Sequence, residues 1–152
     1  MFPLSPDRTL AGTLRMPPAR RLTAAERTRL ALEILGAYAA ARSALAHEPI
    51  ERALARLRAG PVASEARVSG ALWESRRLGA AAARMLRLLP GDTRCLVRSL
   101  VLTRLLARRG IPCTLVIGAR SSPVFLAHAW VEHAGEPVLD PGDGSFARLV
   151  EL

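Results

Sequence analysis

The chain has 152 residues, half of them hydrophobic, which is enough for one globular domain with a buried core. Its 22 basic residues are all arginine and face 13 acidic residues, so the net charge is +9. So basic a surface attracts acidic peptides, nucleic acid or anionic membranes through long-range forces, without selecting among them. Glu or Arg interrupts each apolar stretch well short of the roughly 18 residues that a bilayer span needs, which excludes a membrane-spanning helix.

The N-terminal sequence also lacks the pattern of a secretion signal. Two cysteines allow at most one disulfide. We therefore expect a soluble protein in the reducing cytoplasm.

The first half of the chain is predicted to be helical after an irregular start. Residues 1–21 carry four prolines and no apolar period, which indicates an extended arm or loop. From residue 22 to 152 we expect one domain, helical over 22–90 and with its core at 91–152. Thr23 and Glu26 have capping-box spacing and begin a helix that reaches about His47. Pro49 interrupts it, and a short second helix should end at Gly60.

Two further helices are expected before the pattern changes. The first covers 67–89 and stops at Pro90. In the second, Asp92 is the expected N-cap, Cys95 the third helical position and Arg109 the approximate end. Gly110 then provides a stop signal. Nearly all of its positions except the arginines are apolar, which is typical of a central helix covered on more than one face.

The rest of the chain has strand patterns. Residues 113–119, 125–134 and 134–140 predict an antiparallel meander with Cys113, His128 and Asp140 on successive strands, and with a turn near Gly135. Helices followed by a sheet define the α+β class. The expected architecture is a set of N-terminal helices packed around the cysteine-bearing helix and a small antiparallel sheet.

Cys95, His128 and Asp140 form a candidate catalytic set. Hydrolysis by a thiol needs a thiolate, a base for its proton and a group that orients the base. A helix N-terminus stabilises a thiolate in its first turn, and adjacent strands could bring Asp140 to His128. Asp143 is the alternative orienting carboxylate. Trp130 shares the face of His128 and either shields the site from water or simply packs in the core.

The other candidate residues have simpler interpretations. Cys113 lies at a strand start without a helix dipole, so we expect a buried thiol. His47 ends a helix, where its charge is favoured, and His133 lies beside a turn and should be exposed. Two cysteines and three scattered histidines make a poor zinc set, so we predict no metal and no cofactor.

A resemblance strengthens the catalytic interpretation. The stretches "CLVRSL", "LLARRGIP", "LVIGAR" and "AHAWVE", followed by an aspartate, span residues 95–140 in that order. Together they resemble the leader peptidase of lasso peptide maturation, the McjB C-terminal type of the transglutaminase-like, papain-like cysteine protease superfamily. The resemblance implies Cys95 as nucleophile, His128 as general base and acid, and Asp140 as orienting carboxylate.

The same resemblance implies a substrate and partners. The substrate would be a ribosomally made precursor peptide, cut between leader and core through a thioester at Cys95. An ATP-dependent cyclase would then close the lasso. Only about 90 residues precede Cys95, and they are predicted to be helices and a loop, so we expect a stand-alone protease whose leader-recognition protein is separate. Arg20, Arg21, Arg76 and Arg77 are candidates for a basic face toward that protein or the leader.

Other classes of function remain open. The net charge suits a nucleic-acid-binding protein, but the chain is only 4% aromatic and no stacking platform or finger spacing is visible. A non-catalytic peptide-binding relative would keep the fold without the chemistry. A transglutaminase-type acyl transferase would share all three residues, and only substrate assays separate it from a peptidase.

Overall fold

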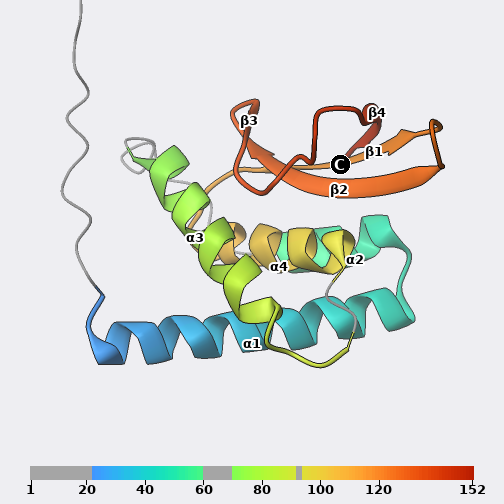
Figure 1. Ribbon diagram of the computed structural model, residues 1–152. Helices are drawn as coiled ribbons and strands as arrows, with labels where there is room; N and C mark the ends of the chain where they lie inside the picture. The colour runs from blue at the N-terminus through green and yellow to red at the C-terminus, as the bar shows by residue number, and fades with distance from the viewer. Residues whose placement is uncertain (1–21, 60–69, 92–93) are drawn as a thin grey trace, which may run out of the picture.

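The computed structural model of the protein describes residues 22–59, 70–91 and 94–152. These residues form four helices and one four-stranded antiparallel sheet, which confirms the α+β class. Figure 1 shows the sheet above helix α4 (Cys95–Ala107), with helix α1 (Ala24–His47) beneath α4. The predicted arm at 1–21 and the proposed N-cap Asp92 lie outside the described residues, as does Gly60, the expected stop of the second helix, which ends at Arg58.

The first two helices form as the sequence predicts. The Thr23 hydroxyl accepts a hydrogen bond from the Glu26 N–H at 3.2 Å, and the Glu26 carboxylate accepts one from the Thr23 N–H at 2.8 Å. This complete capping box fixes the start of α1 and satisfies two N–H groups that would otherwise lack a partner. Pro49 precedes helix α2 (Ile50–Arg58), whose first turn needs no N–H donor from that residue.

The third and fourth helices are shorter than predicted. Helix α3 (Ala71–Leu86) ends three residues before the expected Leu89, because Leu88 and Leu89 donate to the carbonyls three residues back and tighten the chain before Pro90. Helix α4 begins at Cys95 itself, because its N-cap Arg94 is not helical, at φ −59° and ψ 169°. It ends at Ala107 in a similar tight turn, closed by Gly110 at φ +67°.

Helix α4 is the centre of the molecule, as its apolar pattern predicts. It contacts α1, α2, α3 and the sheet. Five of its apolar side chains are fully buried, namely Leu100, Val101, Leu102, Leu105 and Leu106. Burying each such side chain contributes about 1.5 to 3 kcal/mol, so this helix carries much of the core. It therefore gives its first residue, Cys95, a rigid support.

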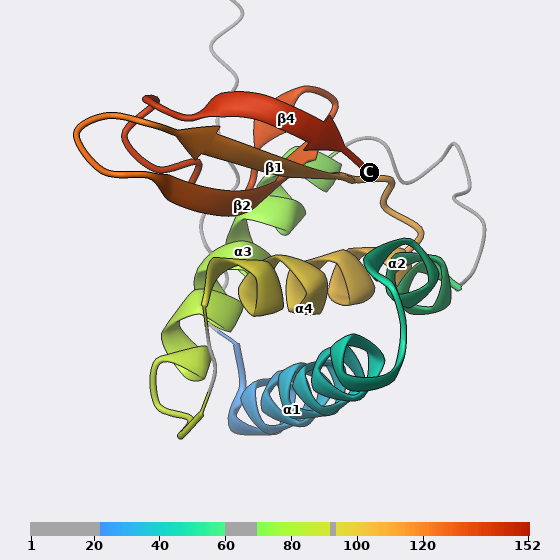
Figure 2. The same ribbon diagram turned by 90° about the vertical axis from the view of Figure 1, so that its right-hand side faces the viewer.

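The sheet contains the predicted meander and one strand that the sequence analysis missed. Strands β1 (Thr114–Arg120), β2 (Leu126–His133) and β3 (Glu136–Pro137) follow each other, and β4 (Ala147–Glu151) pairs with the far edge of β1. Figure 2 shows this sheet over α4. The expected turn is present, with Ala134 at φ 51° and Gly135 at φ 79°, and this left-handed pair is the geometry of a tight hairpin turn.

Two details of the meander were wrong. The third strand was expected to reach Asp140, but it ends at Pro137. Val138 and Leu139 both donate to the single carbonyl of Val131, so the regular ladder stops there. Asp140 therefore lies three residues beyond the strand. Cys113 immediately precedes β1 instead of lying on it. In the part of the chain that the structure describes, no helix is both long and apolar enough to cross a membrane.

Candidate active site

Cys95 is the first residue of α4. Its side chain is half-buried and packs against the core. The N–H groups of the first helical turn have no partner within the helix, and the helix dipole concentrates positive potential there. A thiolate at this position, or an oxyanion beside it, would be stabilised by that potential.

His128 lies near the start of β2, opposite Gly118 of β1. Its Nε2 atom is 2.9 Å from the backbone carbonyl oxygen of Asp140. A carbonyl oxygen can only accept a hydrogen bond, so Nε2 carries the proton when the ring is neutral. The lone pair is then on Nδ1, which is the atom available to take a proton from a thiol.

Two aromatic rings hold the imidazole. The Trp130 ring is stacked on it, with centroids 5.9 Å apart and planes 21° apart, and the Phe146 ring is tilted against it at 5.1 Å. Trp130 is only 4% exposed, so it is a buried residue of the sheet, and its ring covers one side of His128. These contacts restrict the ring, as a catalytic base requires.

The elements that bear Cys95 and His128 are joined by a hydrogen bond. Ser99 of α4 donates through its hydroxyl to the Ala129 carbonyl of β2 at 3.1 Å. Cys95 lies one helical turn before Ser99 on the same side of α4. His128 directly precedes Ala129, which packs in the core with α4, and successive strand residues point to opposite faces, so the imidazole lies with Trp130 on the other face of β2. Within the described residues, no hydrogen bond joins the Cys95 thiol to the imidazole. Catalytic hydrogen bonds often form only when substrate is bound, so a contact between this thiol and the imidazole belongs to the proposal below.

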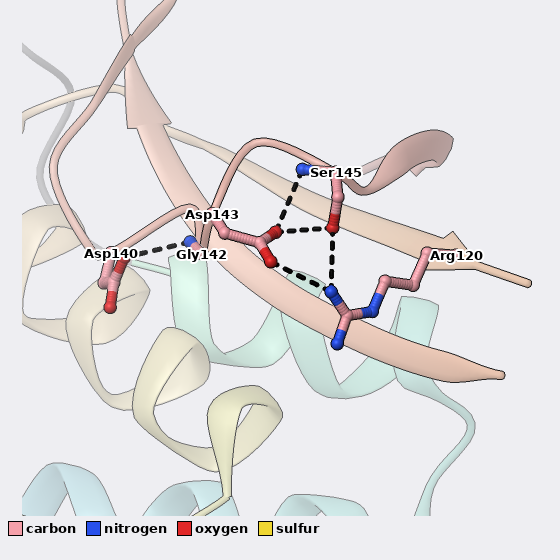
Figure 3. A network of polar contacts seen from close by, with 5 residues as sticks. All are labelled: Arg120, Asp140, Gly142, Asp143 and Ser145. Carbon is pink, nitrogen blue, oxygen red and sulfur yellow. Dashed lines mark hydrogen bonds and ion pairs between the residues drawn. The ribbon is translucent and has the colours of Figure 1, made fainter. Parts of the chain in front are cut away.

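The carboxylates of Asp140 and Asp143 have other partners than His128. The Asp140 carboxylate accepts the Gly142 N–H at 2.9 Å, and Asp143 is paired with Arg120 at 2.9 Å and accepts from Ser145 (Figure 3). Hydrogen bonds from Ser145, together with the Arg120 charge, lower the pKa of Asp143. The structure thus brings Asp140 to His128 through its main chain.

A second polar network lies on the same face of the sheet as His128. The Trp130 indole N–H donates to Glu132 at 2.8 Å, and Arg148 of β4 donates two hydrogen bonds to the Glu132 carboxylate at 3.0 and 2.9 Å. Burial acts to raise the pKa of Glu132, but the hydrogen bonds from Arg148 and Trp130 outweigh it, and the pKa is lowered. The network fixes Trp130 and joins β2 to β4.

Three parts of this site were not predicted from the sequence, namely Phe146, Arg120 and strand β4. Arg120 lies 5.4 Å over the Phe146 ring, and so holds this ring against His128. Gly118, a glycine inside a predicted strand, was the signal in the sequence that could have indicated close packing on this face of the sheet. A Cβ at Gly118 would lie 2.9 Å from the Trp130 ring and 2.8 Å from the Ala147 carbonyl, so only glycine fits there.

The remaining candidates lie outside this cluster. Burial raises the pKa of the Cys113 thiol, which agrees with the expected unreactive cysteine. His133 was expected to be exposed, but it is 8% exposed, and its Nδ1 lies 2.7 Å from the Pro112 carbonyl, a partner that makes burial possible. His47 ends α1 and contacts the Ser43 carbonyl. Among the described residues, no three metal-ligating side chains gather at one point.

Comparison with known proteins assigns the family. The model of the transglutaminase-like superfamily matches residues 30–151, which is most of the chain. The protein therefore belongs to the transglutaminase-like superfamily, whose members typically are Cys-His-Asp hydrolases. Neither the curated proteins nor the solved structures contain a significant match to the chain. The match includes Cys95, His128 and Asp140 but names no substrate.

Proposed function

We propose that the protein is a cysteine peptidase that removes the leader from a ribosomally made precursor peptide during lasso peptide maturation. Membership of the superfamily supports a thiol-based amide chemistry. The resemblance of residues 95–140 to lasso leader peptidases supports the substrate. In this proposal Cys95 is the nucleophile, His128 the base and acid, and Asp140 the residue that orients His128.

The observation that carries the proposal is the position of Cys95 as the first residue of the buried central helix, next to the strand that bears His128. A thiol there lies at the helix N-terminus and is partly exposed to solvent. Cys113 does not lie at a helix N-terminus.

The reaction would proceed in two steps. The Cys95 thiol gives its proton to Nδ1 of His128 and attacks the scissile carbonyl, and the Cys95 N–H donates to the resulting oxyanion. The amide bond breaks when the imidazolium returns the proton to the leaving amine of the core peptide. Water, deprotonated by the same imidazole, then hydrolyses the thioester and releases the leader as a carboxylic acid. The Asp140 carbonyl keeps Nε2 protonated throughout and so fixes the tautomer.

Cleavage of a synthetic precursor by matched cysteine variants tests this function. Cys95→Ala should reduce cleavage to background, whereas Cys113→Ala, which removes a thiol of the same size, should keep most of the wild-type rate. The products are followed by mass spectrometry. Equal loss in both variants, with both folded by circular dichroism, would remove Cys95 from the chemistry.

The superfamily assignment also favours a second candidate, acyl transfer to an amine. The same thioester at Cys95 would then be opened by a primary amine and not by water. Incubation with precursor and excess putrescine separates the two activities. A free leader acid supports the peptidase, and a leader-putrescine amide supports the transferase.

We further propose that a separate recognition protein delivers the leader, and that an ATP-dependent cyclase takes the core. A recognition protein that holds the leader and touches this chain would raise the effective concentration of the scissile bond to about millimolar. Purified protein alone should therefore cut slowly, and addition of the partner should accelerate cleavage at least about tenfold. The acceleration should fade with added salt if arginines make the contact.

A further inference from the structure

An apolar groove runs between α1 and α3 on the helical side of the molecule. It encloses about 500 Å³ and includes Leu30 and Ile34 of α1 and Ala81 and Met85 of α3. Leu88, just beyond α3, also lines it and is 83% exposed. Figure 1 shows α3 running obliquely down to α1, which it reaches with its C-terminal end. An exposed leucine at the end of an apolar groove indicates a surface that another chain could cover.

The rim of this groove is strongly basic. Arg27, Arg77 and Arg84 line it together with the apolar residues, and none of its lining residues is acidic. A second cavity of about 380 Å³ adjoins it, because Leu22, Leu30 and Arg77 line both. The two cavities together are lined by two glutamates and by six arginines, namely Arg27, Arg29, Arg77, Arg84, Arg108 and Arg109.

Both glutamates are already engaged within the protein. Glu33 pairs with Arg109 at 2.7 Å and with Arg29 at 3.4 Å, and Glu26 closes the capping box. Neither glutamate therefore neutralises the arginines on the groove side of α3.

Arg77 and Arg84 are the arginines on this side of α3. No carboxylate pairs with either of them in the described part of the chain. The guanidinium of Arg77 lies 5.2 Å over the Trp73 ring, and its Nε is buried without an acceptor. An unpaired cation with an unsatisfied buried donor, beside an apolar groove, favours an occupant that brings both carboxylates and apolar side chains.

We propose that the α1–α3 groove binds an acidic amphipathic helical segment of a partner protein. Apolar side chains spaced three and four residues apart would enter the groove, and carboxylates beside them would meet Arg77 and Arg84. The concave shape fits a helix better than a bilayer, which is bound by a convex apolar face. The net charge of +9 would steer an acidic partner toward the protein.

This site is separate from the proposed chemistry. Arg108 and Arg109 of the adjoining cavity follow the C-terminal end of α4, whereas Cys95 begins it. Thirteen helical residues span about 20 Å, so the adjoining cavity lies far from Cys95, and none of the residues that line the groove belongs to the proposed catalytic set. Binding at the groove therefore does not depend on the peptidase activity, and a binding measurement alone tests it.

Fluorescence anisotropy with designed peptides tests the site on the full chain. The probe is a labelled amphipathic peptide of about 18 residues, or five helical turns, with leucines on one face and glutamates on the other. A matched peptide carries lysine in place of every glutamate. The acidic probe should bind saturably and the basic probe at least about tenfold more weakly, a difference of about 1.4 kcal/mol. Equal affinity for both probes, or no saturable binding, would overturn the proposal.

Surface variants then locate the binding. Arg84→Glu should weaken the acidic probe about tenfold or more, and Leu88→Ser should weaken it several-fold, because both side chains are exposed at the groove. Arg52→Glu makes the same charge change on the exposed side of α2 and should leave affinity within about twofold. Equal effects of Arg84→Glu and Arg52→Glu would show a nonspecific charge effect. Displacement of the probe by phosphatidylcholine and phosphatidylserine vesicles, lost in Arg84→Glu, would make the groove a lipid site and contradict the proposal.

Discussion

The imidazole Nε2 of His128 lies 2.9 Å from the main-chain carbonyl oxygen of Asp140, while the Asp140 carboxylate accepts the Gly142 N–H. The main-chain contact depends on the path of the backbone and not on the charge of the side chain. We therefore predict that Asp140→Asn keeps much of the activity, because asparagine retains the carbonyl and can still accept from Gly142. His128→Ala should be as damaging as Cys95→Ala, since nucleophile and base act as a unit.

The rate of precursor cleavage by these variants measures the effect. Asp143→Asn is the matched control, since it removes the alternative carboxylate and keeps the shape of the loop. A loss in Asp140→Asn as large as in His128→Ala would show that the carboxylate turns to the ring in the working enzyme. A larger loss in Asp143→Asn than in Asp140→Asn would make Asp143 the orienting residue.

The two cysteines should differ in their reaction with iodoacetamide. Burial raises the pKa of Cys113, so its reactive thiolate forms only at higher pH than in a free thiol of pKa about 8.5. Cys95 begins a helix and is half-exposed, so it should be alkylated first at neutral pH. Peptide mapping after timed labelling measures the order. Labelling of Cys113 before Cys95 in the folded protein would contradict the site.

Acid should remove the contribution of the Glu132 network to stability. The pKa of Glu132 is lowered in the folded protein, so its carboxylate stabilises the fold above the unfolded pKa of about 4.3, and this stability is lost as pH falls through the folded pKa. Glu132→Gln should cost about 1 to 3 kcal/mol at pH 7, because Arg148 loses its charged partner. The difference between the two proteins should shrink toward pH 3. Urea unfolding at both pH values measures it, and a pH-independent difference would show that the charge does not matter.

Two glycine substitutions should have opposite signs. Gly118→Ala places a Cβ within 3 Å of both the Trp130 ring and the Ala147 carbonyl, and should destabilise the fold by about 1 to 3 kcal/mol. Gly36→Ala, inside α1 with nothing within 4 Å of the added Cβ, should stabilise it by about 0.5 to 1 kcal/mol. Thermal melts compare them directly. A neutral Gly118→Ala would mean that β1, β2 and β4 can separate at little cost.

The local signals in the sequence predicted most of the fold. Some features depend only on residues close together in the chain, so the sequence pattern alone revealed them. These are the capping box at Thr23, the apolar residues on nearly all sides of α4 and the turn at Gly135. The sequence pattern did not predict β4, because Ala147–Glu151 is short and entirely exposed, without the alternation that marks a half-buried strand. Its place is fixed by pairing with β1, a contact between residues far apart in the chain.

For the candidate site, too, the sequence predicted local features and not the contacts between residues far apart in the chain. The sequence predicted that Cys95 lies in the first turn of a helix and that Asp140 lies near His128. It could not predict that the Asp140 carbonyl makes the contact, since this depends on how β3 ends at Pro137 and on the path of the following loop. The aromatic contacts of His128 were hidden for a similar reason, because Phe146 reaches the ring from beyond that loop.

Detection of the acyl-enzyme tests the central claim most directly. Wild-type protein and Cys113→Ala are mixed with precursor and recognition partner, quenched in acid within the first turnover, and digested for mass spectrometry. Our account predicts the leader fragment joined as a thioester to the peptide that contains Cys95, present in both proteins and absent in Cys95→Ala. A leader adduct on Cys113, or cleavage that persists in Cys95→Ala, would contradict it.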